Sequence, residues 1–426
     1  MKNIIISVFT LSVFTLVTLF STALNGQTTK GEFFSDPAHA SGVYQVYKHG
    51  IASATPAPEG YKPFYISHYG RHGSRWVHSA ESYTYPRDIL RDAFNANKLT
   101  ALGESVYERV DLAAKDAFGR YGGLTPVGVK EHRGIAERMF FSFPEVFSTE
   151  NGRECNIYSR STVVPRCVLS MAANNERLKE LNPQINITRE AADRYRYLNN
   201  SYKNPKSDST YVIRDEFVKN NIDIDKFLSS LFNDPLYAEE HIDSPVKFIR
   251  ALHLIAIDLP CVSHLNISLL DIFSRDQLFT LWQAFNMVMY YNTGPSSVTG
   301  KIAMDSSKLL LSNIIECANY AIANGNISAD LRFGHDSYII PLLALMDIEG
   351  MNVLEDNPND IYKVWSDFKV SPMAVNIQLV FFRDEMSGEV IVKFLHCENE
   401  VKIPVVTDIA PYYRWADVKA YYEQKL

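Results

Sequence analysis

Strand-like runs near both ends of this chain flank a long helical middle, and this distribution constrains the fold more than any other feature of the sequence. β-Rich runs occur at Phe64–His68 and Asn156–Ser159, and others follow from Asp330 onward. From about residue 175 to residue 300 the apolar positions are spaced as in helices or show no regular period. Strands and helices in this arrangement are typical of an α/β domain. We therefore expect an α/β domain built from the N- and C-terminal parts, with a mainly α-helical inserted domain.

The 426 residues begin with the pattern of an export signal. Lys2 precedes an apolar run from Ile4 to Phe20, and small residues follow it. An uncleaved membrane anchor is the alternative, although the run is slightly shorter than the roughly 20 residues of a spanning helix. No later segment is expected to be long and apolar enough to span a bilayer. The expected division is residues 1–26 as signal peptide, residues 27–174 and 301–426 as the α/β domain, and residues 175–300 as the helical insertion.

Short sequence patterns predict where several strands and helices begin or end. The β-rich runs Asn376–Phe382 and Glu389–Leu395 are separated by a short turn-forming segment and predict an antiparallel hairpin. Thr125 followed by Pro126 is typical of a helix start, with threonine as the cap and proline in the first position. Gly325 closes an apolar helical pattern and is expected just after the helix end.

Composition excludes several classes of function. Apolar residues make up 46% and charged residues 21%, as in soluble globular chains. With 42 Lys and Arg against 49 Asp and Glu the net charge is −7, so no broad basic surface for nucleic acid is expected. The five cysteines show neither CxxC nor zinc-ligand spacing, so we expect no redox or metal site. An anionic substrate would need a locally basic pocket.

The first strand candidate runs directly into a basic segment, Tyr69–Arg75, with the sequence YGRHGSR. Loops at the carboxyl ends of strands are where open α/β sheets bind ligands. Arg71 and Arg75 place guanidiniums, whose forks match phosphate oxygens, on both sides of His72. A neutral imidazole can attack phosphorus there, while the arginines offset charge on the transferring group. A solvated turn is the alternative interpretation.

Two later segments add to this chemistry. His335 and Asp336 follow the short strand candidate Asp330–Gly334, and a carboxylic acid in that place can protonate the leaving oxygen of a phosphate ester. Arg160 and Arg166 follow the second strand candidate and supply two more guanidiniums. The alternatives are a helix cap with a neighbouring histidine in the first case and surface charges in the second.

In combination, these segments resemble the histidine acid phosphatases, the branch of the histidine phosphatase superfamily that includes phytases and multiple inositol polyphosphate phosphatases. The matching residues are Arg71, His72 and Arg75 of the family's RHGxR element, Leu124–Gly128 of its LTPxG segment, the stretch from Ser161 to Arg166, and the HD dipeptide His335–Asp336. The resemblance covers roughly residues 60 to 420. One departure is Val77, where the common form of the first motif has proline.

The resemblance implies a mechanism and a set of site residues. His72 would attack the phosphoryl group and become a transient phosphohistidine, and Asp336 would protonate the departing alkoxide. The groups that would hold the non-bridging oxygens are Arg71, Arg75, Arg166 and His335. Neither a metal nor another cofactor is implied.

Three functions remain open on the sequence. The leading hypothesis is an exported, periplasmic or secreted phosphomonoesterase acting on phytate or other inositol polyphosphates. The sequence RCV at Arg166–Val168 favours the inositol polyphosphate phosphatases, whereas the dipeptide HD at His335–Asp336, in place of HAE, points away from them. A broad-specificity acid or sugar-phosphate phosphatase is the alternative within the class, and a non-catalytic phosphate-ligand binding protein is the alternative outside it. The expected partner is a small phosphomonoester, with no nucleic acid and no stable membrane association after signal removal, and the oligomeric state stays open.

Overall fold

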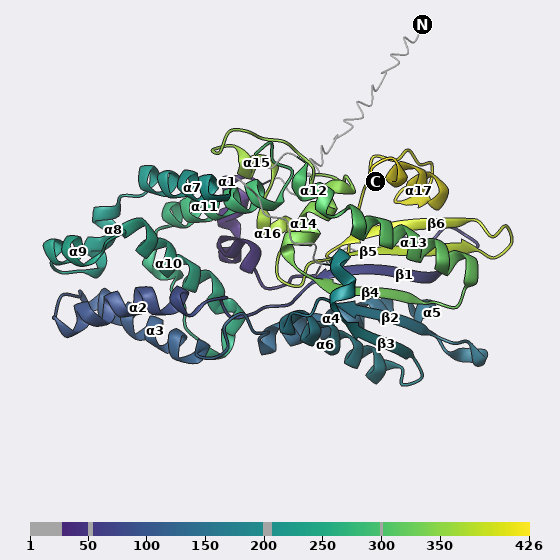
Figure 1. Cartoon of the computed structure of the whole chain (residues 1–426), viewed down its shortest axis with the longest axis horizontal. Coiled ribbons are helices and arrows are strands. Elements are labelled where there is room, and N and C mark those ends of the chain that lie inside the picture. The colour runs from purple at the N-terminus through teal and green to yellow at the C-terminus, as the bar shows by residue number, and fades with distance from the viewer. Residues whose placement is uncertain (1–27, 50–53, 199–206, 299–300) are drawn as a thin grey trace, which may run out of the picture.

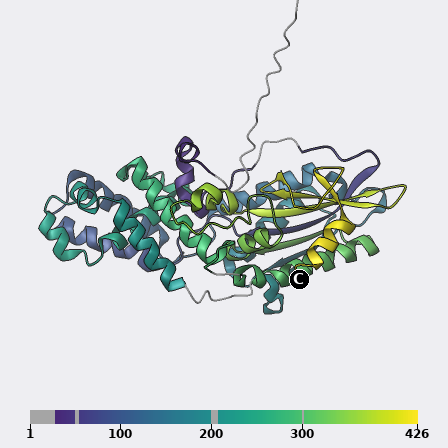
Figure 2. The ribbon, with the colours of Figure 1, turned by 90° about the horizontal axis from the view of Figure 1, so that it is seen from above.

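The computed structural model describes residues 28–49, 54–198, 207–298 and 301–426, so the expected signal peptide lies outside the described residues. The molecule is elongated, with a β-sheet and its covering helices at one end and a group of helices at the other (Figure 1). The same division is seen from above (Figure 2). We call these two parts the sheet half and the helical half.

Eight strands form one mixed sheet in the order β3-β2-β4-β1-β5-β6-β7, with β8 paired to β6. The strands are β1 (Tyr61–Arg71), β2 (Asn156–Ser161), β3 (Asn186–Ala191), β4 (Ala329–Gly334), β5 (Asn376–Asp384), β6 (Val390–His396), β7 (Asn399–Val401) and β8 (Tyr412–Arg414). The strands β3, β2, β4 and β1 are parallel, and β5 runs antiparallel beside β1. The predicted hairpin is confirmed as β5 and β6. Since β1 lies between two strands from the last hundred residues, the α/β fold built from both ends is confirmed.

The helices are α1 (Lys30–Ser35), α2 (Ala80–Asn95), α3 (Ala101–Ala117), α4 (Pro126–Ser142), α5 (Pro144–Phe147), α6 (Pro165–Leu181), α7 (Ser207–Asn221), α8 (Ile224–Leu231), α9 (Pro235–His241), α10 (Pro245–Asp258), α11 (Arg275–Thr293), α12 (Ile302–Ser306), α13 (Lys308–Asn324), α14 (Asp336–Leu345), α15 (Ile361–Val364), α16 (Asp367–Val370) and α17 (Trp415–Glu423). The predicted cap is confirmed, because the Thr125 side chain accepts from the Gly128 N–H at the start of α4. Gly325 follows α13 in the left-handed conformation, as predicted.

Helices cover both faces of the sheet. Neighbouring residues of β1 enter different cores: Tyr65 packs on the side of α13, α14 and α17, and Ile66 packs on the side of α4 and α6. Figure 1 shows α13 and α17 on one side of the strands and α4 and α6 on the other. Strand β4 is buried along its whole length, which is typical of a central strand covered on both faces. The sheet therefore forms the middle of three layers.

The helical half draws on two separate stretches of sequence. Its core joins α2 and α3 with α7, α8, α10 and α11. Three elements thus pack outside the part of the chain to which the expected boundaries assign them: α2 and α3 precede residue 174 yet pack among the middle helices, and β3 follows residue 175 yet pairs with β2. The reason is amphipathicity, since α2 and α3 each have an apolar face that the sheet, already covered by α4 and α6, cannot bury.

Within the described residues, one helical run is long and apolar enough to cross a membrane, judged by length and composition alone. It is Pro245–Leu265, which comprises α10 and the 3₁₀ helix η4 (Leu259–Leu265). The expectation that no segment after the first 26 residues has this length and apolarity is therefore wrong. Its most apolar window is 61% buried inside the protein. The run is a core helix of the helical half.

Candidate functional site

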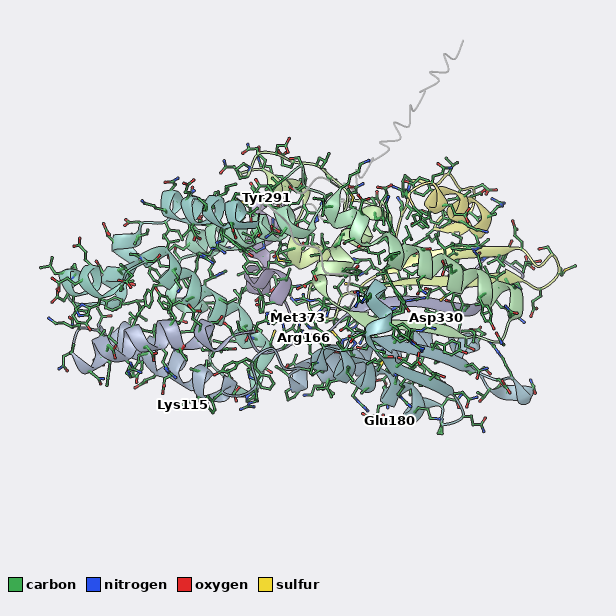
Figure 3. The ribbon with its side chains drawn as sticks, in the orientation of Figure 1. Lys115, Arg166, Glu180, Tyr291, Asp330 and Met373 are labelled. Carbon is green, nitrogen blue, oxygen red and sulfur yellow. The ribbon has the colours of Figure 1, made fainter. Side chains whose placement is uncertain are left out.

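Three parallel strands bring the predicted site residues to one edge of the sheet. The last residue of β1, Arg71, lies opposite Gly334 at the end of β4, and the end of β2 lies opposite Phe333. The chain continues these pairings beyond the strands, since His72 N–H donates to Gly334 O (2.9 Å). Arg166 lies where the sheet half meets the helical half (Figure 3). The carboxyl edge of the sheet therefore faces the helices of the other half.

The His72 imidazole is buried and held in one tautomer. Its Nδ1 lies 2.9 Å from the Gly73 carbonyl oxygen, which can only accept, so Nδ1 carries the proton. Burial lowers the pKa of His72 well below its ordinary value, and the charges of Arg71 and Arg75 lower it further. The side chain is therefore neutral, with the lone pair on Nε2. This is the state in which an imidazole can act as a nucleophile.

The Arg71 guanidinium is fully buried and firmly anchored. Its Nη1 donates to the carbonyls of Val43 (2.6 Å) and Ser371 (2.9 Å). Its Nη2 forms an ion pair with Asp336 at 2.7 Å. Its Nε is buried without a hydrogen-bond partner. A buried guanidinium with an unused donor is prepared for an anion.

Arg75 is also held in place by hydrogen bonds. Its Nη1 donates to the Trp76 carbonyl (3.0 Å) and its Nη2 to the Tyr44 hydroxyl (3.2 Å). The guanidinium also lies over the Tyr44 ring, with 4.9 Å between its central carbon and the ring centroid. Its Nε has no hydrogen-bond partner and is buried, as in Arg71. These contacts hold the Arg75 guanidinium in place and leave its Nε able to donate to an anion.

His335 and Arg166 complete the group. Arg166 Nη2 donates to Nδ1 of His335 (3.4 Å), so the His335 proton is on Nε2, which donates to Thr162 Oγ1 (3.3 Å). Burial and the charge of Arg166 lower the pKa of His335 to about 4. The rings of His335 and His72 are 5.7 Å apart. We call the side chains of Arg71, Arg75, Arg166 and His335 the cradle.

Asp336 is ionised. Burial alone would raise its pKa, but the charges of Arg71 and Arg75 outweigh burial and lower the pKa to about 2. Asp336 begins α14, and Ser337 N–H donates to its Oδ1. The residue expected to act as the proton donor is therefore a carboxylate while Arg71 is its partner. An anion that engages Arg71 would take away the partner that keeps Asp336 ionised.

The loop that carries His72 rests against the start of α4. Ser74 O accepts from both the N–H and the hydroxyl of Thr125, at 2.9 and 3.0 Å. A Cβ on Gly128 would lie 2.4 Å from Ser74 O, and one on Gly73 would lie 2.6 Å from Gly128 O. Only glycines permit this backbone contact. The LTPxG resemblance therefore corresponds to a support for the loop.

Buried side chains that the sequence did not reveal also support the loop. Glu131, one helical turn after Gly128, accepts from Ser74 N–H (2.7 Å) and its hydroxyl (2.8 Å). Ser170 of α6 accepts from Gly73 N–H (3.1 Å). Neither residue had a local signal, since a single acid or serine in a helix is usually exposed.

The entrance to the site contains His78. Burial and the charges of Arg75 and Arg166 lower the pKa of His78 to about 3, so the ring is neutral. Both His78 and Arg166 approach Gly122: a Cβ there would lie 3.4 Å from the histidine ring and 3.7 Å from the guanidinium. Trp76, two residues before His78, is buried, and its Nε1 donates to Asp116.

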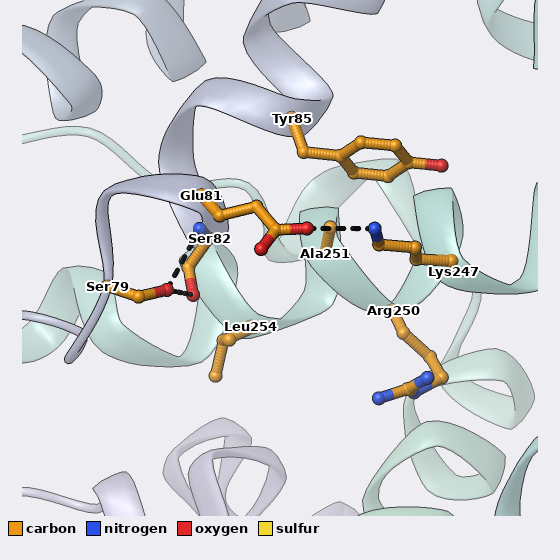
Figure 4. Close-up of a pocket in the computed structure, with 8 residues that line it drawn as sticks. All are labelled: Ser79, Glu81, Ser82, Tyr85, Lys247, Arg250, Ala251 and Leu254. Carbon is orange, nitrogen blue, oxygen red and sulfur yellow. Dashed lines mark hydrogen bonds and ion pairs between the residues drawn. The ribbon is translucent and has the colours of Figure 1, made fainter.

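A groove of about 170 Å³ lies elsewhere, between α2 and α10 (Figure 4). Its cationic groups already have carboxylate partners, because Lys247 pairs with Glu81 (2.9 Å) and Arg250 shares Asp215 (2.8 Å) with Arg214. Unlike the cradle, the groove has no group of guanidiniums with buried unused donors among its described lining residues. Among the residues that the structure describes, no group of three or more His, Cys, Asp or Glu side chains is arranged to hold a metal ion.

The fold is similar to those of several solved structures. Multiple inositol polyphosphate phosphatase from Bifidobacterium longum, in complex with inositol hexasulfate, superimposes with a TM-score of 0.76 over 90% of this chain and 97% of that one, at 18% identity. The chain has the histidine acid phosphatase fold. The phytase from D. castellii gives a TM-score of 0.66 over 91% of this chain and 84% of that one, at 13% identity. The apo form of Hafnia alvei phytase gives 0.52 over 87% and 98%, also at 13% identity.

The likeness lies in structure rather than in overall sequence. No family model matches the chain, and no curated protein matches it. Within the histidine acid phosphatase fold, the six residues predicted from the sequence meet at the carboxyl edge of the sheet. Their catalytic roles stay predictions.

Proposed function

We propose that this chain is a phosphomonoesterase that transfers the phosphoryl group of an inositol polyphosphate to His72 and then to water. One observation carries the proposal: a buried neutral imidazole, held in a single tautomer, lies among three guanidiniums, each of which has a buried Nε without a hydrogen-bond partner. Fixed positive charge around a free lone pair is what attack on a phosphate ester requires. The fold, shared with phosphatases and phytases, supports the same function.

The first step forms a bond between His72 Nε2 and phosphorus and breaks the bond from phosphorus to the ester oxygen. Asp336 gives its proton to the departing alkoxide. The cradle neutralises charge on the oxygens that stay with phosphorus. In the second step water attacks phosphorus, the bond to Nε2 breaks, and a water proton returns to Asp336.

Asp336 acquires its proton when substrate binds. As its ion-pair partner, Arg71 holds the carboxylate ionised. A phosphate dianion in the cradle competes for Arg71 and adds negative charge nearby, so the pKa of Asp336 rises. Turnover is therefore favoured at acidic pH.

Phosphate release tests the proposal. Purified protein is incubated with phytate, a hexose phosphate and an aryl phosphate at pH 3 to 8, and the phosphoenzyme is trapped with radiolabelled substrate. We expect release from phytate and a base-stable, acid-labile label that is lost in His72→Ala. Release from the hexose phosphate in preference to phytate supports the broad-specificity alternative. Phosphate binding without release or label supports the non-catalytic alternative.

The substrate class rests on the structural neighbours. The Bifidobacterium longum protein is named as a multiple inositol polyphosphate phosphatase, and its structure holds inositol hexasulfate. The shared fold and the cradle support a substrate of that kind for this chain.

We also propose that the chain is exported, on the basis of its first 26 residues. Protein recovered from outside the cytoplasm is sequenced from its N-terminus. A first residue shortly after Ala23 or Gly26 supports export with cleavage, whereas an intact Met1 on membrane-bound protein supports the anchor instead.

A further inference from the structure

A buried carboxylate from the helical half lies behind the cradle. Asp258, the last residue of α10, is 1% exposed. Its Oδ2 accepts from the Tyr83 hydroxyl (3.0 Å) and from the Val77 N–H (3.2 Å). Its Oδ1 is buried without a hydrogen-bond partner. Such a carboxylate is costly unless a positive charge compensates it.

Asp258 and Arg75 bind the two ends of one peptide group. Arg75 Nη1 donates to the Trp76 carbonyl (3.0 Å), and the Val77 N–H of the same peptide donates to Asp258 Oδ2 (3.2 Å). The Tyr44 hydroxyl also accepts from Arg75 and holds it in place. Burial raises the pKa of Asp258 to about 7, although the positive charge of Arg75 acts in the opposite direction.

The hydrogen bond from the Val77 N–H to Asp258 depends on the departure of this chain from the common form of the first motif. Val77 stands where the common form has proline, and its N–H donates to Asp258. Proline has no N–H and could not make this bond. The substitution thus gives a buried carboxylate its backbone donor.

Other ionisable groups also lie near Asp258 and Arg71, and burial raises the pKa of each. The groups that face Asp258 from neighbouring elements are Tyr83 of α2, Tyr44 of the 3₁₀ helix η1 (Pro37–Tyr44) and Cys261 of η4. Burial raises the pKa of each of these three, so they stay protonated at neutral pH. On the Arg71 side, burial raises the pKa of Asp367 to about 6 and also raises that of Glu131.

We propose that Asp258 is a positioning residue that sets how much of the Arg75 charge is available to phosphate. The ionised carboxylate of Asp258 offsets the charge of Arg75, and protonation of Asp258 leaves the guanidinium charge to the ligand. The inference rests on the proposed function only in treating Arg75 as a phosphate-binding group. The helical half thus influences phosphate affinity without touching the phosphate.

Sulfate binding tests this inference in the full-length protein. Sulfate keeps its charge from pH 5 to 9, so a change in affinity reports on the protein. We expect the wild type to lose affinity on the order of tenfold as pH rises through about 7, as for a coupling of one pKa unit. Asp258→Asn keeps an acceptor for Tyr83 and Val77 but has no charge. This variant is expected to show no fall in sulfate affinity near pH 7, a fall that we call the step. At pH 8.5 it is expected to bind sulfate about tenfold more tightly than wild type.

Tyr83→Phe is the matched variant, since it removes one hydrogen bond and leaves the charge. Its step is expected at higher pH, because the Tyr83 bond lowers the pKa of Asp258. A step near pH 6 that survives in Asp258→Asn belongs to Asp367 and agrees with the inference.

Identical steps near pH 7 in wild type and Asp258→Asn overturn the inference. If Asp258→Asn does not fold, an unchanged step in Tyr83→Phe overturns it. A wild type that does not bind sulfate overturns it as well. Sulfate binding without phosphate release from any ester contradicts the proposed function and leaves this inference standing.

Discussion

Replacement of Gly128 by alanine is expected to disable the site by moving one loop. The new Cβ would lie 2.4 Å from Ser74 O and 2.8 Å from Ser74 N, whereas ordinary contacts begin at 3.4 Å, so the loop must yield by about 1 Å. Ser74 lies between His72 and Arg75, and both would move with it. A misplacement of about 1 Å costs on the order of 100-fold in catalysis. We therefore expect kcat/KM to fall about 100-fold.

The same substitution is expected to leave the protein folded. Overpacking costs about 1 to 3 kcal/mol in free energy of unfolding. Alanine in a helix recovers up to about 1 kcal/mol of this. The net loss of about 0 to 2 kcal/mol is small beside the roughly 5 to 15 kcal/mol of a typical protein. Urea unfolding and phosphate release measure the two effects separately.

Gly134→Ala is the control on the same helix. A Cβ at Gly134 would meet the guanidinium of Arg138, with Nη1 nearest at 2.8 Å and Cζ and Nη2 at 3.6 and 3.7 Å, and this end of a flexible side chain can shift to relieve the contact. We expect unchanged kcat/KM and a change in stability within about 1 kcal/mol. Wild-type kcat/KM in Gly128→Ala would refute the argument that α4 sets the position of the loop.

Three further predictions concern the charged groups of the site. His72→Ala is expected to abolish phosphate release while keeping sulfate affinity, and turnover at the wild-type rate would remove His72 from the nucleophile role. Asp336→Asn is expected to slow alkyl phosphates far more than aryl phosphates, and to tighten sulfate binding because Arg71 loses its partner at 2.7 Å; equal losses on both ester types would contradict the acid role. Burial raises the pKa of Asp258 from 3.8 to about 7, so the folded protein binds this proton more tightly than the unfolded chain does. The free energy of unfolding is therefore expected to fall by on the order of 4 kcal/mol as pH rises from about 4 to 7, at about 1.4 kcal/mol for each pH unit. Unfolding curves of wild type and Asp258→Asn should therefore agree near pH 4 and separate above it, with the variant more stable, and parallel curves would refute the assignment.

The parts of this protein that could be predicted are those with local causes. The hairpin of β5 and β6, the Thr125 cap and the glycine after α13 each depend on a few neighbouring residues. The site residues were also predictable, because they stand in short motifs directly after strands. Parallel strands then bring those motifs to one edge, which is a property of the sheet and not of any one motif.

The parts that could not be predicted depend on distant partners. An apolar face shows that α2 and α3 need a neighbour, but not whether that neighbour is the sheet or another helix. Asp258 and Glu131 look like ordinary acids in helices, and only the packed structure shows that they are buried against the motif. Asp336 was recognised as an acid, but its ionised state follows from Arg71 at 2.7 Å.

The strand order also determines when the site can exist. Strand β1, which leads to His72, has β4 and β5 as its neighbours, and these begin at Ala329 and Asn376. During synthesis from the N-terminus, about 260 residues must follow β1 before its first neighbour is made. Contacts so distant in sequence make folding slow. The nucleophile therefore stays without its cradle until the last quarter of the chain has been made, so an unfinished chain has no assembled site with which to attack phosphate esters.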